Sequence, residues 1–355
     1  VHASPSLAML LAQDEEVLVD DYHVDFPATS DRLLTTDADG IHCLGNRGGL
    51  EIRKSSFAGM ADDAINIHGR AAKVLELRSA REIKISTGGT VAPRVGEEIA
   101  IYDPEGGRYR GRAKITSVVS AGASSLWLTL TQDIKGIIAN AQDLKKADWL
   151  FNLDACGQDA KIHHNTFGRH RGRSLVLRAL RTSVYENTFK NADGAAINIL
   201  LNGAWGEGPI PGHITLSKNT FTGVDRGDNS RASPAISTSI IRRSGGYASS
   251  APISDVTVQN NVFEGLKGLT MRVSNATAFQ VLGNWTNNTR KNKVVKSASI
   301  DFRPGTSATL NAYAVSDKNP ETYAGIHIKA GAKVTYQGLK MDLAPGIPWV
   351  RDDNP

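Results

Sequence analysis

Three aspartates have the residue type and the spacing that acid and base chemistry requires. Asp39 lies in the stretch TTDADGIHC, and Asp62 and Asp63 lie in GMADDAINIHG. Carboxylates that share a site repel one another, so the pKa of at least one rises, and carboxyl groups with separated pKa values divide into an acid and a base. Hydrolysis of a glycosidic bond needs one protonated carboxyl and one ionised carboxyl. The three aspartates are therefore candidate catalytic residues.

Two non-catalytic interpretations compete for the same residues. A single aspartate at a strand corner commonly stabilises a turn. A cluster of oxygen ligands also binds calcium, but Ca²⁺ takes six to eight oxygen atoms. We keep the catalytic interpretation for the three aspartates taken together, and we predict neither a metal site nor a cofactor.

A repeat has to bring these aspartates together. An asparagine stands two positions before the phenylalanine that ends four of five similar segments. The segments are LEIRKSSF, AKIHHNTF, TSVYENTF, ITLSKNTF and VTVQNNVF, which end at Phe57, Phe167, Phe189, Phe221 and Phe263. A second short strand follows, with aliphatic residues eight and ten positions later, as at Ile65 and Ile67. Phe167 and Phe189 lie 22 residues apart, which gives the length of one coil.

Such a unit of two or three short strands cannot bury its apolar face alone and must stack on its neighbours. The repeat therefore predicts an all-β fold, a right-handed parallel β-helix, because parallel crossovers are right-handed in nearly all cases. The recurring asparagines would form an internal ladder that bonds each coil to the next. A leucine-rich solenoid has a similar period and its own asparagine ladder, but the leucine spacing that it needs is absent.

The 110 residues between Phe57 and Phe167 are far more than one coil. Within them, VLELRSAREIKIS, GEEIAIYD, GRAKITSV and SLWLTLT alternate apolar and polar residues between glycine-rich turns, which is typical of antiparallel strands. We expect first β-helix coils over 1–69, an inserted small antiparallel β-barrel over 70–152 and the remaining coils over 153–300. The segment 301–355 would form closing strands that cover the end of the helix.

Coil register determines how close the aspartates come. If Ile41 lies beside Ile65, Asp39 and Asp63 occupy equivalent positions in adjacent coils, with backbones about 4.8 Å apart. By the same register Arg173, in the corner GRHRGRS, stacks over Asp63.

Five further polar residues are candidate substrate contacts. Asn66 and Asn198 alternate with inward aliphatic residues, so their side chains should point outward. The basic corner around Arg173 is equally well explained as a solvated surface. The predicted substrate-binding residues are Asn66, His68, His170, Arg173 and Asn198.

Composition narrows the range of partners. The formal net charge of +5, from 41 basic and 36 acidic residues, is too small to indicate nucleic-acid binding. The apolar run from Leu7 to Ala12 is too short for a membrane span. We therefore expect an oligosaccharide or polysaccharide substrate, with no nucleic acid and no membrane. The compartment is not readable from these residues, and a periplasmic or secreted bacterial location is the expectation.

The motifs resemble a known enzyme family. DADGIH, then RGG before LEIRKSSF, then GM followed by DDAINIHG and an inserted barrel resemble family 110 of the glycoside hydrolases. Those enzymes are β-helical α-1,3-galactosidases that act with inversion on terminal galactose. Polygalacturonases, with NTDG and DD motifs in the same layout, are more distant relatives. The match is strongest from about Ala12 to Gly69.

The resemblance implies roles for the aspartates. Asp62 would be the general acid, and Asp39 and Asp63 would hold and activate the attacking water. Family members usually carry a long β-helical region before the first of these aspartates, whereas 38 residues precede Asp39 here. Substrate contacts from upstream coils would then be missing or come from another chain, which leaves a homo-oligomer open.

Two other functions remain alternatives at this stage. One is a hydrolase or lyase of an acidic or sulphated polysaccharide, whose anionic groups would bind the corner from Arg169 to Arg173. The other is a non-catalytic β-helix that binds glycans without cleaving them, which would need the repeat but no acidic corner.

Overall fold

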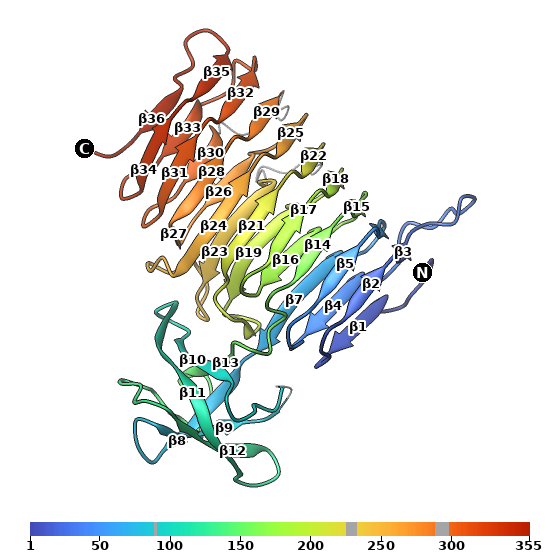
Figure 1. The fold of residues 1–355 in the computed structure, drawn as a ribbon. Helices are drawn as coiled ribbons and strands as arrows, with labels where there is room; N and C mark the ends of the chain where they lie inside the picture. The colour runs from blue at the N-terminus through green and yellow to red at the C-terminus, as the bar shows by residue number, and fades with distance from the viewer. Residues whose placement is uncertain (89–90, 225–232, 288–297) are drawn as a thin grey trace.

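The computed structural model describes residues 1–88, 91–224, 233–287 and 298–355. Three long sheets of mainly parallel strands run along the molecule, and a small barrel projects from one side (Figure 1). No helix that could cross a membrane occurs among these residues. The all-β parallel β-helix with an inserted barrel is thus confirmed, and the right hand follows the general preference of parallel crossovers.

Each coil contributes one strand to each of the three sheets. The first sheet contains β1 (Met9–Ala12), β4 (Ile41–Leu44), β7 (Ile65–Arg70), β16 (Leu175–Arg178), β19 (Ile197–Asn202), β23 (Ile236–Ile241), β26 (Met271–Val273), β30 (Ala298–Phe302), β33 (Ala324–Ile328) and β36 (Val350–Asp352), with β20 (Glu207–Gly208) paired to β19 and β7. The second contains β2 (Leu18–Asp20), β5 (Glu51–Arg53), β14 (Lys161–His163), β17 (Ser183–Tyr185), β21 (Gly212–Ser217), β24 (Ile253–Gln259), β28 (Phe279–Leu282), β31 (Ser307–Asn311) and β34 (Lys333–Gln337), with β27 (Ala276–Thr277) beside β24. The third contains β3 (His23–Val24), β6 (Ser56–Phe57), β15 (Thr166–Phe167), β18 (Thr188–Lys190), β22 (Thr220–Thr222), β25 (Val262–Glu264), β29 (Trp285–Asn287), β32 (Ala314–Asp317) and β35 (Lys340–Leu343).

The repeated phenylalanines form a buried stack inside the helix. Rings of successive coils lie nearly parallel, with centroids 4.7 Å apart from Phe167 through Phe189 and Phe221 to Phe263. Each ring fills the space between one coil and the next, so the stack fixes which residues face each other. The aliphatic residues of the first sheet, such as Ile65, pack against the same core.

The repeated asparagines form the expected ladder beside this stack. Asn187 Nδ2 donates to Asn219 Oδ1 at 3.0 Å, and Asn187 Oδ1 accepts the backbone N–H of Asn165 at 3.0 Å. The same bonds link Asn219 to Asn261 and Asn261 to Asn284. All of these amides are buried, where a polar group without a partner would be costly. The ladder therefore penalises any slip in register.

The inserted barrel begins where β7 ends. Six antiparallel strands close on themselves in the order β10, β11, β12, β9, β8, β13. Their bounds are β8 (Ala72–Leu77), β9 (Glu82–Ser86), β10 (Glu98–Asp103), β11 (Arg108–Ser120), β12 (Ser125–Leu130) and β13 (Trp149–Asn152). The barrel has its own apolar core, and its loop at Gly106 and Gly107 accepts hydrogen bonds from Ser250 of the β-helix.

The C-terminal segment differs from the expectation of closing strands. Strands β31 to β36 continue the three sheets in parallel register, so this segment adds further coils (Figure 1). Thr286 takes the phenylalanine position in the preceding coil, and Val315 and Met341 take it in these coils. Coil geometry persists there because other side chains fill the interior, although the sequence signature is lost.

We predict that Asn187→Ala lowers the free energy of unfolding by about 2 to 4 kcal/mol, because it leaves the buried backbone N–H of Asn165 without its acceptor and removes the side-chain bond to Asn219. Chemical denaturation measures this loss. The exposed Lys190→Ala on the same coil is the matched control and should change stability by less than about 0.5 kcal/mol. Equal effects of the two substitutions would contradict the role of the ladder.

Candidate active site

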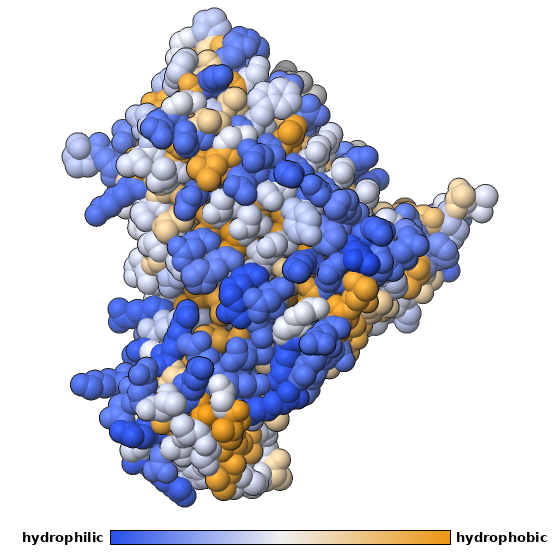
Figure 2. All heavy atoms as spheres, viewed as in Figure 1, coloured by the Kyte–Doolittle hydropathy of each residue, from blue (hydrophilic) through white to orange (hydrophobic). Residues whose placement is uncertain are grey.

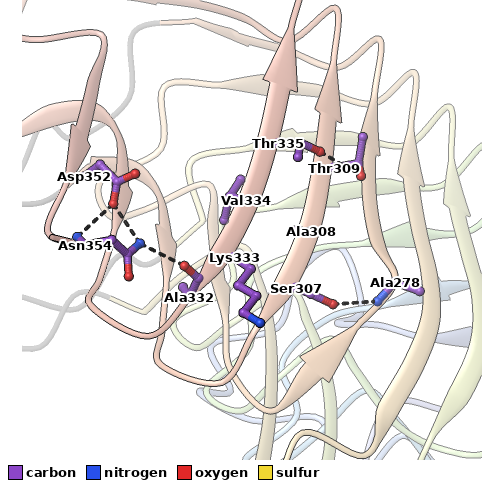
Figure 3. Close-up of a pocket in the computed structure, with 10 residues that line it drawn as sticks. All are labelled: Ala278, Ser307, Ala308, Thr309, Ala332, Lys333, Val334, Thr335, Asp352 and Asn354. Atoms are coloured by element: carbon purple, nitrogen blue, oxygen red, sulfur yellow. Dashed lines mark hydrogen bonds between the residues drawn. The ribbon is translucent and has the colours of Figure 1, made fainter.

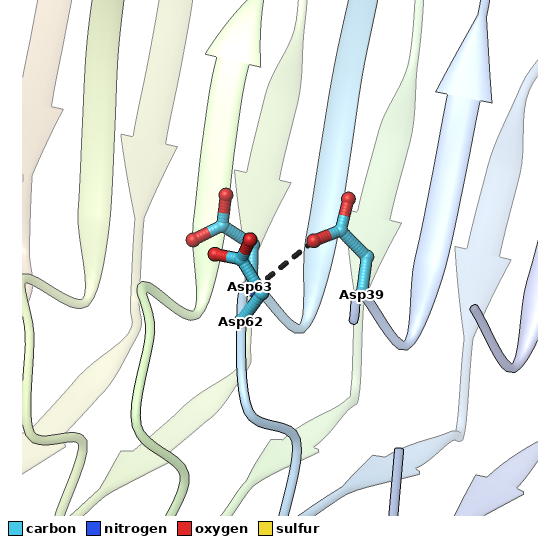
Figure 4. A group of neighbouring side chains, drawn as sticks. All are labelled: Asp39, Asp62 and Asp63. Carbon is cyan, nitrogen blue, oxygen red and sulfur yellow. Dashed lines mark hydrogen bonds between the residues drawn. The ribbon is translucent and has the colours of Figure 1, made fainter. Parts of the chain in front are cut away.

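Coil register places the aspartates at one corner of the helix. Ile41 pairs with Ile65, and Ile65 pairs with Leu175 on the other side. The backbone N–H of Asp63 donates to Asp39 Oδ1 at 3.2 Å. Figure 4 shows the three carboxyl groups of Asp39, Asp62 and Asp63 on the same side of this corner, and one oxygen of each lies within 4.8 Å of the others.

The carboxyl groups open into a pocket of about 290 Å³. We call it the acidic pocket. It is lined by Leu7, Ala38, Asp39, His42, Asp62, Asp63, Asn66, Arg173, Arg178, Asn202, Trp205 and Glu207. The pocket therefore lies on the outer face of the first sheet, next to the hairpin turn that links β19 to β20.

Asp63 is held by a two-pronged ion pair. Arg173 Nε donates to Asp63 Oδ1 and Arg173 Nη2 donates to Asp63 Oδ2, both at 2.7 Å. The backbone N–H of Arg173 also reaches Asp63 Oδ1 at 3.0 Å. The Asp63 side chain is buried, and this planar pairing fixes its orientation. The arginine comes from the next coil, as register predicts.

A chain of histidines holds Asp39. His42 Nδ1 lies 2.7 Å from Asp39 Oδ2, and His42 Nε2 lies 2.9 Å from His68 Nε2. His68 Nδ1 lies 3.0 Å from the carbonyl oxygen of Gly69. A carbonyl oxygen only accepts, so His68 must carry a proton on Nδ1. Burial lowers the pKa of His68 to about 3, and the positive charge of Arg178 adds to this, so the ring is neutral near neutral pH.

The positions of the protons on His42 and Asp39 follow from the proton on His68 Nδ1. A neutral His68 with its proton on Nδ1 presents a bare Nε2, which accepts a hydrogen bond from His42 Nε2–H. His42 Nδ1 and Asp39 Oδ2 then share one proton, because two bare acceptors would repel at 2.7 Å. Asp39 is therefore oriented by two contacts, the backbone of Asp63 and the ring of His42.

Asp62 differs from the other two aspartates. It has no ion-pair partner among the described residues, and its side chain is more exposed than theirs. Partial burial raises the pKa of Asp62, and the negative charges of Asp63 and Asp39 raise it further, against the opposing effect of Arg173. Of the three carboxyl groups, Asp62 is thus the one whose environment favours the protonated form.

A buried ion pair closes one side of the acidic pocket. Arg178 Nη2 lies 3.1 Å from Glu207 Oε2, and Arg178 Nη1 donates to Asn66 Oδ1 at 2.6 Å. Arg178 pairs in register with His68, and Glu207 comes from β20. The pair joins the wall formed by the hairpin to the floor formed by the first sheet.

The structure brings only part of the predicted set into the acidic pocket. Asn66 and Arg173 line it, whereas His68 lies behind it and reaches it through His42. His170 is buried, with Nδ1 2.8 Å from the carbonyl oxygen of Gly168, and does not line the pocket. Asn198 faces Ser237 on the neighbouring strand and also lies outside.

Sequence reasoning missed five polar or aromatic residues of this site, Asn202 among them. His42 had a recognisable signal, because it stands in register with Asn66 one coil earlier. Arg178 had a weaker one, its place opposite His68. Trp205 and Glu207 come from the hairpin inserted after β19, and only the longer spacing of that coil marks the insertion.

The calcium interpretation does not fit the donor set. Both oxygens of Asp63 already accept hydrogen bonds from Arg173, and Asp39 is held by His42 and the backbone of Asp63. A divalent cation among the carboxylates would lie beside the Arg173 guanidinium and be repelled by it. The positive charge that balances this cluster comes from the protein.

Another hollow, on the C-terminal coils, has a volume of about 560 Å³, but its lining contains no cluster of carboxyl groups (Figure 3). Its lining is Ala278, Ser307, Ala308, Thr309, Ala332, Lys333, Val334, Thr335, Asp352 and Asn354. Asp352 is the sole carboxylate among them and accepts hydrogen bonds from Asn354. The carboxylate cluster therefore singles out the acidic pocket.

Several curated proteins have related sequences. α-1,3-Galactosidase B of Bacteroides thetaiotaomicron is 25% identical over 221 residues, which cover 61% of this chain and 35% of that protein. α-1,3-Galactosidase B of Akkermansia muciniphila is 25% identical over 230 residues, covering 62% and 28%. α-1,3-Galactosidase A of B. thetaiotaomicron is 29% identical over 194 residues, covering 52% and 33%. The alignments thus span about a third of each relative. No family model matches the chain.

Two solved structures have a partly similar course of the chain. The catalytic unit of the GH87 α-1,3-glucanase from Streptomyces thermodiastaticus aligns with a TM-score of 0.45 and 13% identity, covering 98% of this chain and 46% of that one. The Pseudomonas phage phi297 tailspike gp61 aligns with a TM-score of 0.36 and 14% identity, covering 88% and 68%.

We predict that the His68 ring stays neutral, with its proton on Nδ1, between about pH 8 and pH 5, because its pKa of about 3 lies far below the usual 6.5. Nitrogen-15 NMR of the imidazole measures this, and His68→Gln identifies the signal. Since the unfolded chain takes up this proton first, the contribution of His68 to stability falls as pH drops below 6.5. An imidazolium signal for His68 at about pH 5 would contradict the proton assignment.

Proposed function

We propose that the protein is an exo-acting glycoside hydrolase of family 110 that releases terminal α-1,3-linked galactose with inversion. The observation that carries this proposal is that the three carboxyl groups have different environments. Asp62 has a raised pKa, whereas Asp63 is tied to Arg173 and Asp39 to His42. The related sequences named α-1,3-galactosidase support the choice of bond and sugar.

Asp62 acts as the general acid. Its raised pKa keeps a larger share of the carboxyl protonated near neutral pH than an exposed aspartate would have. The proton goes to the glycosidic oxygen as the bond to the anomeric carbon breaks. Greater exposure than Asp39 and Asp63 suits this role, because the departing sugar must approach Asp62 from outside.

Asp39 and Asp63 position the attacking water. Each carboxylate has about four lone-pair directions, so one that accepts two or three protein hydrogen bonds can still accept one from water. The proton that the water loses goes to Asp39, and the proton shared by Asp39 Oδ2 and His42 Nδ1, which lie 2.7 Å apart, then stays on the His42 ring. This arrangement completes a direct displacement on the face opposite the leaving group.

The choice of inversion rests on how Asp39 and Asp63 are held. The oxygens lie within 4.8 Å of one another, nearer to the spacing of about 5 Å typical of retaining enzymes. A retaining mechanism, however, needs a carboxylate that is free to attack carbon. Asp63 is engaged by Arg173 through both oxygens, and Asp39 by His42 and the backbone, so both are better suited to orient water.

The acidic pocket suits a neutral sugar. Its two arginines are already paired, Arg173 with Asp63 and Arg178 with Glu207. A uronic acid or a sulphated sugar would need a cation whose charge is not yet balanced. Hydroxyl groups, in contrast, can bond to Asn66, Asn202 and the free lone pairs of the carboxylates, all of which line the pocket.

Asp62→Asn tests the acid. We expect kcat on an α-1,3-linked galactoside to fall by about 10³-fold while the fold is retained, because the amide cannot donate the required proton. Asp37→Asn is the matched control, since Asp37 is an exposed aspartate of the same corner region that does not line the acidic pocket. Release of galactose at the normal rate by Asp62→Asn would refute the assignment.

The anomeric configuration of the released galactose tests whether the mechanism proceeds with inversion. Proton NMR during the first minutes of hydrolysis should show β-galactose forming before mutarotation produces the α-anomer. Initial formation of α-galactose would mean that an aspartate attacks carbon directly, and inversion would have to be abandoned. Binding of galactosides with no turnover by the unmodified protein would favour a non-catalytic glycan-binding module.

A further inference from the structure

An exposed tryptophan stands at the edge of the acidic pocket. Trp205 is 70% exposed, although tryptophan is mostly buried in folded proteins. It lines the acidic pocket and also a second hollow of about 590 Å³ on the side of the barrel. We call this the barrel-side hollow, which is lined by Lys73, Glu105, Leu144, Lys145, Trp149, Gly203, Ala204, Trp205, Gly206, Arg243 and Ser244. The indole is therefore a wall shared by the two hollows.

The backbone that carries Trp205 is firmly held. The Trp205 N–H donates to the carbonyl oxygen of Asn202, and the Gly206 carbonyl accepts the N–H of Ala71 at 2.9 Å. After the turn, β20 pairs with β7 at Glu207 and Arg70. An apolar ring exposed on a rigid turn keeps its place without a further loss of backbone freedom on binding.

The opposite wall of the barrel-side hollow is equally fixed. Glu105 of the barrel pairs with Arg243 of the β-helix at 3.1 Å and accepts a hydrogen bond from Ser244 at 2.6 Å. The Arg243 N–H also donates to the carbonyl of Pro104. These contacts clamp the barrel to the β-helix, so the hollow has a constant shape.

The charges in this hollow are not balanced. Glu105 balances Arg243, but no carboxylate of the described residues lies within 4.0 Å of the Lys73 or Lys145 ammonium groups. Lys73 Nζ lies 3.7 Å from the centroid of the Trp149 ring. Burial, together with the nearby positive charges of Arg243 and Arg70, lowers the pKa of Lys73 to about 8. An anion beside Lys73 would relieve this unfavourable environment.

We propose that the barrel-side hollow binds the leaving-group side of the glycan, with Trp205 as an aromatic platform and Lys73 as the contact for an anionic substituent. The inference rests on the proposed function, because it takes the acidic pocket as the place of the terminal galactose. The remaining sugars then pass over Trp205, whose apolar face packs against the C–H face of a sugar ring.

The charged and hydroxyl side chains of the barrel-side hollow agree with a polar ligand. On the face of the molecule that Figure 2 shows, hydrophilic residues cover most of the surface and hydrophobic residues appear in scattered patches. A protein partner of standard size would call for a broader interface with a buried apolar centre. A glycan needs instead one aromatic surface with polar groups around it, as Trp205, Lys73 and Ser244 offer.

Kinetics of the full-length chain with graded substrates test the proposal. The substrates are an α-1,3-galactosyl disaccharide, a neutral tetrasaccharide with the same terminal linkage, and two tetrasaccharides with a sulphate or a carboxylate on the leaving-group side. Trp205→Ala should lower kcat/KM on the tetrasaccharides about ten-fold more than on the disaccharide. Lys73→Met should reduce the preference for anionic over neutral tetrasaccharides about five-fold.

The control is Trp349→Ala, which removes an exposed tryptophan from the C-terminal end of the helix and should leave these ratios unchanged. Equal losses on all substrates for Trp205→Ala, or an unchanged charge preference for Lys73→Met, would overturn the binding site. Calorimetry of glycan binding tests the barrel-side binding site separately from the proposed hydrolase function. Trp205-dependent binding without turnover would reject the hydrolase and keep the site, whereas turnover without dependence on Trp205 would do the reverse.

Discussion

The register between coils is the constraint on which the rest of this structure depends. The phenylalanine stack and the asparagine ladder lie inside the helix, yet they decide which side chains meet on its outer face. A shift of one residue would turn every inward side chain outward and separate Asp39 from Asp63. The interior repeat therefore sets the geometry of the site as directly as the site's own hydrogen bonds.

Electrostatic balance at the corner follows from the same stacking. Two coils bring the carboxyl groups together, and the next coil supplies Arg173. The register alone therefore places Arg173 where it forms an ion pair with Asp63. His42 contacts Asp39 from the strand that follows it in the same coil, and His42 is held in turn by His68 of the following coil. Asp62 receives neither partner. A single row of stacked corners thus gives three carboxyl groups three different sets of partners, which is the kind of asymmetry that acid and base chemistry requires.

The fold and the carboxylate cluster can be predicted from the sequence, but the walls of the acidic pocket cannot. The repeat around Phe167 and Phe189 predicts the coils, and their alignment predicts that Arg173 lies over Asp63. The repeat predicts no coils after residue 300, because Val315 and Met341 replace the signature phenylalanine there while the coils continue. Trp205 and Glu207 lie in a hairpin with no periodicity. Their place depends on tertiary pairing with β7, which no local pattern encodes.

The inserted barrel changes what an open β-helix face can recognise. A bare stack of coils offers a shallow corner, and the arginines of the acidic pocket, both already paired, leave it no unbalanced cation for an anionic glycan. The barrel adds a second wall next to the hairpin turn, and with it Lys73 and an unbalanced positive charge. In the proposed function, recognition of the leaving group lies outside the carboxylate cluster. Selectivity for longer glycans can vary through these residues without disturbing the register that the aspartates need.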